Sequence, residues 1–178
     1  MNAYTTWVAA NPLLAAALQF ALLGTLGETL SHLLTTRRAG LPGTLPQMLA
    51  KMLGWALLGV IIKAGFAGMK GFTLALIEHR LLPGACATGL AWAFSVSVLT
   101  NLLFGPQMMA FHRLTDNLIL RRRGCAGIQR AWWTLLWFWI PAHTLTFSLP
   151  PDYQIGLAAV WSVVLGIILG FSTQKGPR

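Results

Sequence analysis

Residues 48–77 read MLAKMLGWALLGVIIKAGFAGMKGFTLALI, and the only charged residues in this stretch are Lys51, Lys63 and Lys70. A helix needs about 20 apolar residues to cross the hydrocarbon core of a bilayer, so this stretch is long enough to span a membrane. The whole chain has the same character, because 56% of its 178 residues are hydrophobic and only 10% are charged. Ordinary soluble domains have about 25% charged residues. The composition therefore predicts an integral membrane protein.

Four further apolar segments accompany this one. Pairs such as Pro83-Gly84 and Pro150-Pro151 separate them, and such pairs break helices. We predict an all-α, polytopic transmembrane helix bundle that forms a single integral membrane domain over residues 1–178, with about five apolar helices of which four to five span. Asn11 is placed to cap the first helix. The predicted helices lie near 12–34, 48–77, 85–120, 132–149 and 153–171.

The basic residues are distributed unevenly along the chain. The net charge is +9, but these residues lie between apolar runs and not on one soluble face, which argues against nucleic-acid binding. With five crossings, one side of the membrane receives only Arg80 and the acidic Asp152. The other side receives Arg37, Arg38, Lys51, Arg121, Arg122, Arg123, Arg130, Lys175 and Arg178. Because basic residues are retained on the cytoplasmic side, we predict the N-terminus outside and the C-terminus inside.

The start of the chain and its basic face bear on location and partners. Residues 1–11 contain no basic residue and no clear cleavage site, so we expect the first helix to remain in the mature protein. This fits a bacterial plasma (inner) membrane, with an organelle membrane as the alternative. The expected partners are the lipid bilayer, with anionic lipids at the basic face. A homo-oligomer is a further prediction, because Gly166 and Gly170 form a Gly-x-x-x-Gly pattern that also serves packing within one chain.

Ionisable residues inside the apolar segments need an explanation. A charged group at the centre of a bilayer costs from about 2.5 to more than 10 kcal/mol. Glu28 and His32 lie one helical turn apart in the first segment, and Lys63 lies near the middle of the second. A buried Glu28–Lys63 ion pair that fixes the register of two helices is one explanation. A polar passage and a lysine that extends to the interface are the other two.

Two prolines within apolar segments predict helix kinks. Pro106 and Pro141 each remove a backbone hydrogen bond from a helix, which bends it and exposes a carbonyl group. Thr100 and Asn101 precede the first proline, and His143 follows the second. These polar side chains can bond exposed backbone or face the interior of the bundle.

Other polar and aromatic residues are predicted to lie at the membrane interface. Beyond Pro106, His112, Arg113 and Asp116 occupy successive turns and are expected to form a hydrogen-bonded polar cap. The tryptophans of the fourth segment favour an interfacial aromatic belt over a surface that stacks on a substrate. They are Trp132, Trp133, Trp137 and Trp139.

The sequence carries no catalytic or metal-binding motif. It has no Gly-x-Ser-x-Gly, no His-Glu-x-x-His and no pair of intramembrane carboxylates. It has no Cys-x-x-Cys, and Cys86 and Cys125 lie at opposite ends of the third segment, too far apart to pair. Glu78-His79-Arg80 is expected to be a solvated helix end. We predict that the protein is not an enzyme and requires no metal or cofactor.

The sequence also resembles the family of the twenty-two-kilodalton peroxisomal membrane protein, the Mpv-seventeen family. Asn11-Pro12, Gly27-Glu28 and Ser31-His32 are similar to the opening helix of that family, which has a Gly-Asp pair followed by Gln. Residues 100–106, TNLLFGP, resemble a stretch in which an Asp-Gln pair precedes Phe-x-Pro. Trp139, Phe147 and Pro151 resemble its C-terminal run, with His143 where Gln is usual. The resemblance implies a distant, bacterial member, in a family where weakly selective channel-like activity is proposed for some proteins.

Two functions remain open from the sequence. In the first, the protein is a small channel-like or transport protein whose helices enclose a polar passage. The alternative is a non-conducting structural or assembly protein of the membrane, in which the same residues lock the bundle and the basic face binds lipid or a partner protein. The residues predicted to line the passage are Glu28, His32, Lys63, Thr100, Asn101 and His143.

Overall fold

The computed structural model describes residues 2–37, 40–121 and 128–174, without the side chains of Arg130 and of residues 169–174. Within these ranges all regular secondary structure is helical, which confirms the all-α class. The element η1 is a 3₁₀ turn, and η2 and η3 are π-helical turns. In chain order the elements are α1 (Ala3–Ala10), α2 (Pro12–Thr36), α3 (Leu45–Glu78), η1 (Gly84–Ala87), α4 (Gly89–Leu99), η2 (Thr100–Phe104), α5 (Gly105–Ile119), α6 (Ile128–Thr134), η3 (Leu135–Trp139), α7 (Ile140–Ser148) and α8 (Pro151–Gln174).

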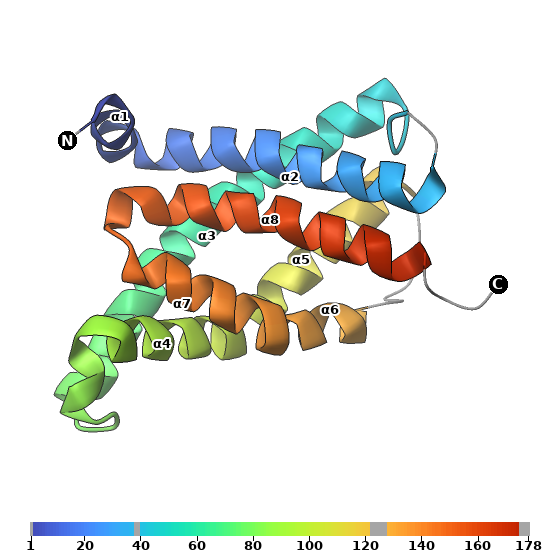
Figure 1. Cartoon of the computed structure of the whole chain (residues 1–178). Coiled ribbons are helices and arrows are strands. Elements are labelled where there is room, and N and C mark those ends of the chain that lie inside the picture. Colours follow the sequence, from blue (N-terminus) through green and yellow to red (C-terminus); the bar gives the residue numbers. More distant parts are fainter. Residues whose placement is uncertain (1, 38–39, 122–127, 175–178) are drawn as a thin grey trace.

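The helices run back and forth across the bundle. Helix α2 packs against both α3 and α8, and α4 packs against α7. Figure 1 shows α2 and α8 side by side in the same direction, with α3 crossing diagonally behind them. The helices α4 and α5, on either side of η2, run in different directions (Figure 1). The loops therefore collect at two ends of the bundle, as alternating crossings require.

Close approaches between helices occur at glycines. A Cβ atom on Gly166 of α8 would lie 2.5 Å from the carbonyl oxygen of Gly27 on α2. One on Gly59 of α3 would lie 2.6 Å from the carbonyl oxygen of Ala16 on α2. Small residues permit such contacts in lipid, where van der Waals packing holds helices together. Gly166 thus serves packing within the chain.

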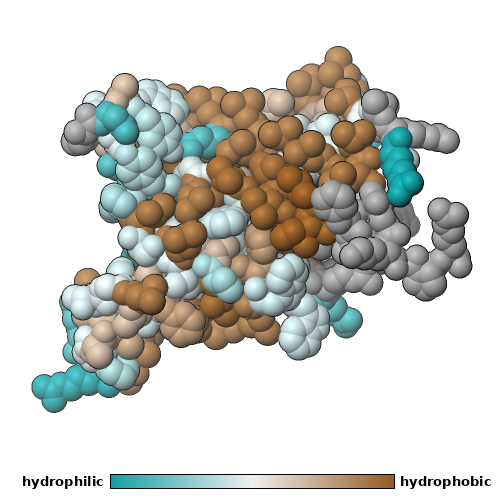
Figure 2. All heavy atoms as spheres, viewed as in Figure 1, coloured by the Kyte–Doolittle hydropathy of each residue, from teal (hydrophilic) through white to brown (hydrophobic). Residues whose placement is uncertain are grey.

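The lengths and surfaces of the helices identify a multi-pass membrane protein. Large apolar side chains lie on the outside of the bundle, for example Leu53, which is 71% exposed. Figure 2 shows apolar residues over much of the visible face. The fifth predicted helix corresponds to α6, η3 and α7, which contact α5, α4 and α8. The helices long and apolar enough to cross a membrane are Pro12–Thr36, Leu45–Glu78, Gly89–Ile119 and Pro151–Ile168.

Several helix ends differ from the prediction. Asn11 occupies the predicted N-cap position of α2, but its side chain makes no capping bond. Its side-chain nitrogen instead donates to the carbonyl oxygen of Trp7 at 3.3 Å, at the end of α1, a helix that the sequence pattern does not predict. The third segment becomes α-helical only at Gly89, whose φ of +60° interrupts a right-handed helix. The fourth begins at Ile128, before the predicted start at 132.

The predicted orientation depends partly on residues outside the described ranges. Arg37 and Arg121 are exposed, at the end of α2 and just after α5. Arg80 is exposed near the other end of the bundle, after α3. The orientation stays a prediction. Outside the described residues lie Arg38, Arg122, Arg123, Cys125, Lys175, Arg178 and the side chain of Arg130.

Candidate functional site

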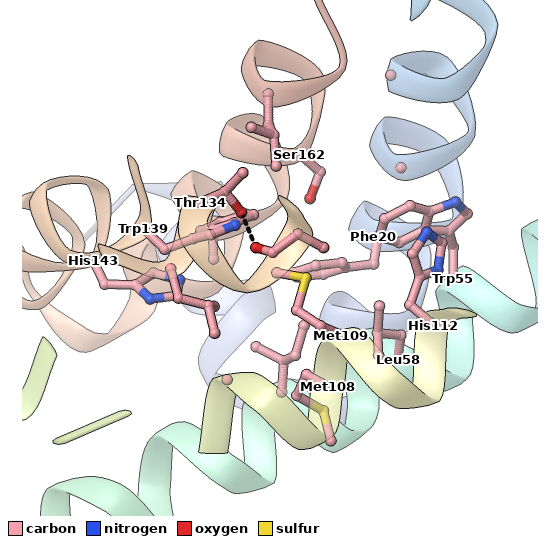
Figure 3. Close-up of a pocket in the computed structure, with 18 of the residues that line it drawn as sticks. Phe20, Trp55, Leu58, Met108, Met109, His112, Thr134, Trp139, His143 and Ser162 are labelled. Atoms are coloured by element: carbon pink, nitrogen blue, oxygen red, sulfur yellow. Dashed lines mark hydrogen bonds between the residues drawn. The ribbon is translucent and has the colours of Figure 1, made fainter. Parts of the chain in front are cut away.

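A cavity of about 300 Å³ lies inside the helix bundle. Its wall is built mainly from α2, α3, α5 and α8 together with the turns η2 and η3. Figure 3 shows apolar side chains such as Phe20, Leu58 and Met109 converging on it. Four of the predicted passage residues contribute to its lining: Glu28, Thr100, Asn101 and His143.

A set of interacting polar residues, Glu28, Lys51, Trp55, His112 and Asp116, adjoins the cavity, and we call it the charged cluster. Of these residues, Glu28, Trp55 and His112 form part of the cavity wall. The Lys51 ammonium donates to Glu28 Oε2 and lies 3.2 Å from Asp116 Oδ1. Trp55 Nε1 donates to Glu28 Oε1 at 2.8 Å, and His112 Nε2 lies 4.0 Å from the same oxygen. The cluster therefore joins α2, α3 and α5.

The predicted Glu28–Lys63 ion pair is wrong, since Glu28 pairs with Lys51. The reason is the depth of each residue in the hairpin formed by α2 and α3. Glu28 lies eight residues before the end of α2, and Lys51 lies six residues after the start of α3. Because the two helices are antiparallel, these positions face each other. Lys63 is 12 residues further along, roughly 18 Å away at 1.5 Å per residue.

The predicted polar cap of α5 contributes to this cluster. His112 and Asp116 do not simply cap their own helix, because they face α2 and α3 across the interface. The ring of His112 lies 4.5 Å from that of Trp55 between centroids (Figure 3). Arg113, the third member of the predicted cap, lines the cavity.

Glu28, His112 and Asp116 also present ligand atoms of the kind that hold metal ions. One atom from each lies within 4.8 Å of the others. Lys51 is only 7% exposed and already places its ammonium group against both carboxylates. A cation entering this site would have to displace that ammonium. The expectation that the protein needs no metal stays a prediction.

A second hollow, which we call the vestibule, adjoins the charged cluster. It has a volume of about 330 Å³, and its rim includes the exposed Thr35 and Thr36. Glu28 and His32 line it together, as expected for two residues one turn apart. Its lining also includes Lys51 and Asp116. Among the described residues, Lys63 lines neither this vestibule nor the cavity.

Three of the predicted passage residues, Thr100, Asn101 and His143, meet Trp139 in a second polar region of the cavity, which we call the neutral pole. Asn101 Nδ2 lies 3.1 Å from His143 Nδ1, which brings η2 and α7 together. The ring of Trp139 lies 5.0 Å from that of His143. Thr100 and Asn101 are each only 1% exposed.

Sequence reasoning missed three members of these two regions. The sequence pattern places Lys51 among the basic residues of a loop, gives no role to Trp55, and groups Trp139 with the interfacial tryptophans. Trp133 and Trp137 are exposed on the outside of the bundle, as a belt predicts, but Trp139 faces the cavity. The signal for Lys51 is its distance along the chain from the loop between α2 and α3, which is similar to that of Glu28. Its position opposite Glu28 follows from the loop that joins the two helices.

The comparisons with other proteins give no assignment. No known protein family matches the chain, and no curated protein or solved structure matches it. The function has to be inferred from the geometry of this site.

Proposed function

We propose that this membrane protein is a small channel-like or transport protein whose solutes pass between the vestibule and the cavity. The observation that supports this proposal is that the two hollows share three lining residues, Glu28, Ser31 and His112. A solute that leaves one hollow for the other has to pass these side chains. In this conformation Glu28 is bonded to Lys51 and Trp55, so the route opens only if these contacts separate.

The cavity also has a closure beyond the neutral pole. The ring of Phe66 lies 5.3 Å from His143 and 4.8 Å from Phe147 between centroids, and both contacts are edge-on. Phe66 is 3% exposed and Phe147 is 4% exposed. A path across the membrane therefore requires these aromatic rings to separate as well. In this proposal solute moves through the cavity between the charged cluster at one end and the aromatic rings at the other. The charged cluster selects which solutes pass.

Selection by charge follows from the composition of this cluster. Glu28 and Asp116 attract cations, and Lys51 supplies the positive charge that balances them. The prediction that the protein is not an enzyme is part of this proposal. Membership of the Mpv-seventeen family and a bacterial plasma membrane with the C-terminus inside are part of this proposal.

A structural or assembly role is the second candidate, favoured by the burial of Lys51. This residue is 7% exposed and bridges carboxylates of two other helices. Such a contact locks three helices together whether or not solute passes. On this alternative, lipid or a partner protein binds the basic face, and the purified protein conducts nothing.

Flux through purified protein in liposomes separates the two candidates. We would measure the cation-to-anion permeability ratio for wild type, Glu28→Gln, Lys51→Met and the matched control Lys63→Met. Removing the carboxylate should lower this ratio, and removing the ammonium should raise it. Lys63→Met carries the same substitution in the same helix but lines neither hollow, so it should match wild type.

The test compares the direction in which each variant changes the cation-to-anion permeability ratio. A loss of folding would not change this ratio in opposite directions in the two variants. Each variant is first checked by gel filtration and circular dichroism in detergent. Opposite shifts for Glu28→Gln and Lys51→Met support the passage. Shifts in the same direction, or no flux of ions and small neutral solutes through folded wild type, would reject it and favour the structural role.

A further inference from the structure

Two π-helical turns face each other at the neutral pole. The turn η2 contacts η3, and each directly precedes a helix that has proline as its second residue, Pro106 in α5 and Pro141 in α7. Proline removes a backbone donor and so interrupts the regular hydrogen-bond ladder. Side chains also bond the backbone at this point, since Ser97 Oγ and Thr144 Oγ1 each donate to the carbonyl oxygen of Ile140, the residue before Pro141, at 2.7 Å. Such π-turns occur frequently at functional sites.

Three buried polar atoms around these turns have no partner among the described residues. They are Thr100 Oγ1, Asn101 Oδ1 and Trp139 Nε1. All three residues line the same cavity. Buried polar groups are normally bonded, because leaving one unpaired costs free energy. Because the three residues belong to one cavity wall, a ligand held in that cavity is the candidate partner for these atoms.

The orientation of the Asn101 side chain is fixed by its neighbours. Its Nδ2 donates to the carbonyl oxygen of Ser97 at 2.8 Å. A carbonyl oxygen only accepts, so the amide cannot be turned around without losing this bond. The Oδ1 atom therefore remains an acceptor without a partner. Trp139 Nε1 is a donor, and Thr100 Oγ1 can donate or accept. The neutral pole therefore offers both hydrogen-bond donors and acceptors to a ligand.

The rest of the cavity favours an uncharged ligand with an apolar body. The charged lining residues Glu28 and Arg113 belong with His112 to the other part of the cavity wall. His112 follows Asn101 by 11 residues along η2 and α5, which is roughly 16.5 Å at 1.5 Å per residue. Between them the wall includes Met108 and Met109, whose flexible side chains adapt to different shapes. A volume of about 300 Å³ is at the lower end of the range for small-molecule sites.

We propose that the neutral pole binds an uncharged small molecule with an apolar body and one polar group that both donates and accepts hydrogen bonds, such as an alcohol or a primary amide. The polar group bonds Asn101 Oδ1, Thr100 Oγ1 and Trp139 Nε1, and the body lies against the apolar wall. This inference names a solute class for the proposed passage and rests on that passage only for the route of entry. Binding itself is measured without flux.

The test uses probes of one length that differ in their polar group. Hexanol, hexanamide, hexane, hexanoate and hexylammonium are dialysed to equilibrium against the purified full-length protein in detergent micelles, with empty micelles as the blank. After subtraction, hexanol and hexanamide should bind at least about tenfold more tightly than hexane and the two ions. That ratio corresponds to one or two ordinary hydrogen bonds.

A pair of isosteric variants assigns the binding to the pole. Thr100→Val removes an unpartnered hydroxyl and should weaken hexanol binding about fivefold without changing hexane binding. Thr25→Val is the matched control, because Thr25 Oγ1 is also buried and unpartnered but does not line the cavity. It should leave both affinities unchanged. Neither variant breaks a described side-chain hydrogen bond, so both should fold.

Three results would overturn the proposal. One is equal binding of hexane and hexanol, which would leave only an apolar void. Another is an equal effect of Thr100→Val and Thr25→Val on hexanol binding. The third is no binding of any probe by folded protein, as for a cavity that holds only water. Hexanol binding without any flux would instead reject the passage and retain the ligand site.

Discussion

The charged cluster and the neutral pole border the same cavity, yet they satisfy their polar atoms in opposite ways. In the charged cluster, both oxygens of Glu28 accept hydrogen bonds, and Lys51 contacts both carboxylates. At the neutral pole, Thr100 and Asn101 are more deeply buried, but each retains an atom without a partner. Charged side chains in the bundle are thus paired with one another. Neutral polar side chains at the neutral pole keep atoms that a ligand can bond.

This contrast has an energetic origin. An unpaired charge in a medium of low dielectric costs far more than an unpaired hydroxyl or amide oxygen. A membrane protein can therefore keep orphaned neutral groups for function while it pairs its charges. It follows that substitutions in the charged cluster should change stability strongly, and that substitutions of orphaned groups at the neutral pole should change ligand binding with little change in stability.

The largest expected effect tests the charged side of the comparison. Lys51→Met should lower the free energy of unfolding by about 3 kcal/mol, because it leaves the half-buried carboxylates of Glu28 and Asp116 without their counter-charge. Titration with sodium dodecyl sulphate in mixed micelles, followed by circular dichroism, measures this change. Lys63→Met is the control and should cost less than about 1 kcal/mol. Equal losses in both variants would show that the cluster is not a special determinant of stability.

A smaller effect is expected where α2 and α8 touch beside this cluster. Gly166→Ala places a methyl group 2.5 Å from the carbonyl oxygen of Gly27, so the helices must separate next to Glu28. The cost should be about 1–3 kcal/mol by the same titration. Gly68→Ala is the matched control, since nothing lies within 4 Å of its added Cβ and it should gain up to about 1 kcal/mol in helix stability. If Gly166→Ala behaves like Gly68→Ala, the contact is not tightly packed.

The fold was largely predictable because the apolar length of each segment indicates a membrane helix independently of the other segments. Apolar length decides that 48–77 is a helix whatever its neighbours are, and Leu45–Glu78 is the observed element. The errors lie at helix ends. Asn11 bonds the helix before it, and Ile128 starts a helix within a polar stretch. The hydrogen bond at Asn11 is a local feature that composition does not report.

The site was predictable only in part because it depends on helix rotation and depth. Glu28, Thr100, Asn101 and His143 were selected as polar residues in apolar segments, and the structure brings them to one cavity. The partner of Glu28 was wrong, because Lys63 was chosen for its central position and not for its distance from the hairpin loop. The position of Trp139 on the cavity side depends on the π-turn η3, which the sequence does not encode in a recognisable pattern.

The smallest expected effect tests the neutral side with two buried threonines. Thr100 Oγ1 is buried without a partner among the described residues, so Thr100→Val removes an unsatisfied group and should raise the free energy of unfolding slightly, by up to about 1 kcal/mol. Thr146 Oγ1 donates to the carbonyl oxygen of Ala142 at 2.9 Å and accepts from Trp161 Nε1 at 3.1 Å. Thr146→Val should therefore cost about 1–3 kcal/mol, because the indole donor is left unpaired. The two residues are 1% and 0% exposed, so burial does not distinguish them. A Thr100→Val cost as large as that of Thr146→Val would mean that the Thr100 hydroxyl is already bonded in the empty protein, and the neutral pole would lose the property that separates it from the charged cluster.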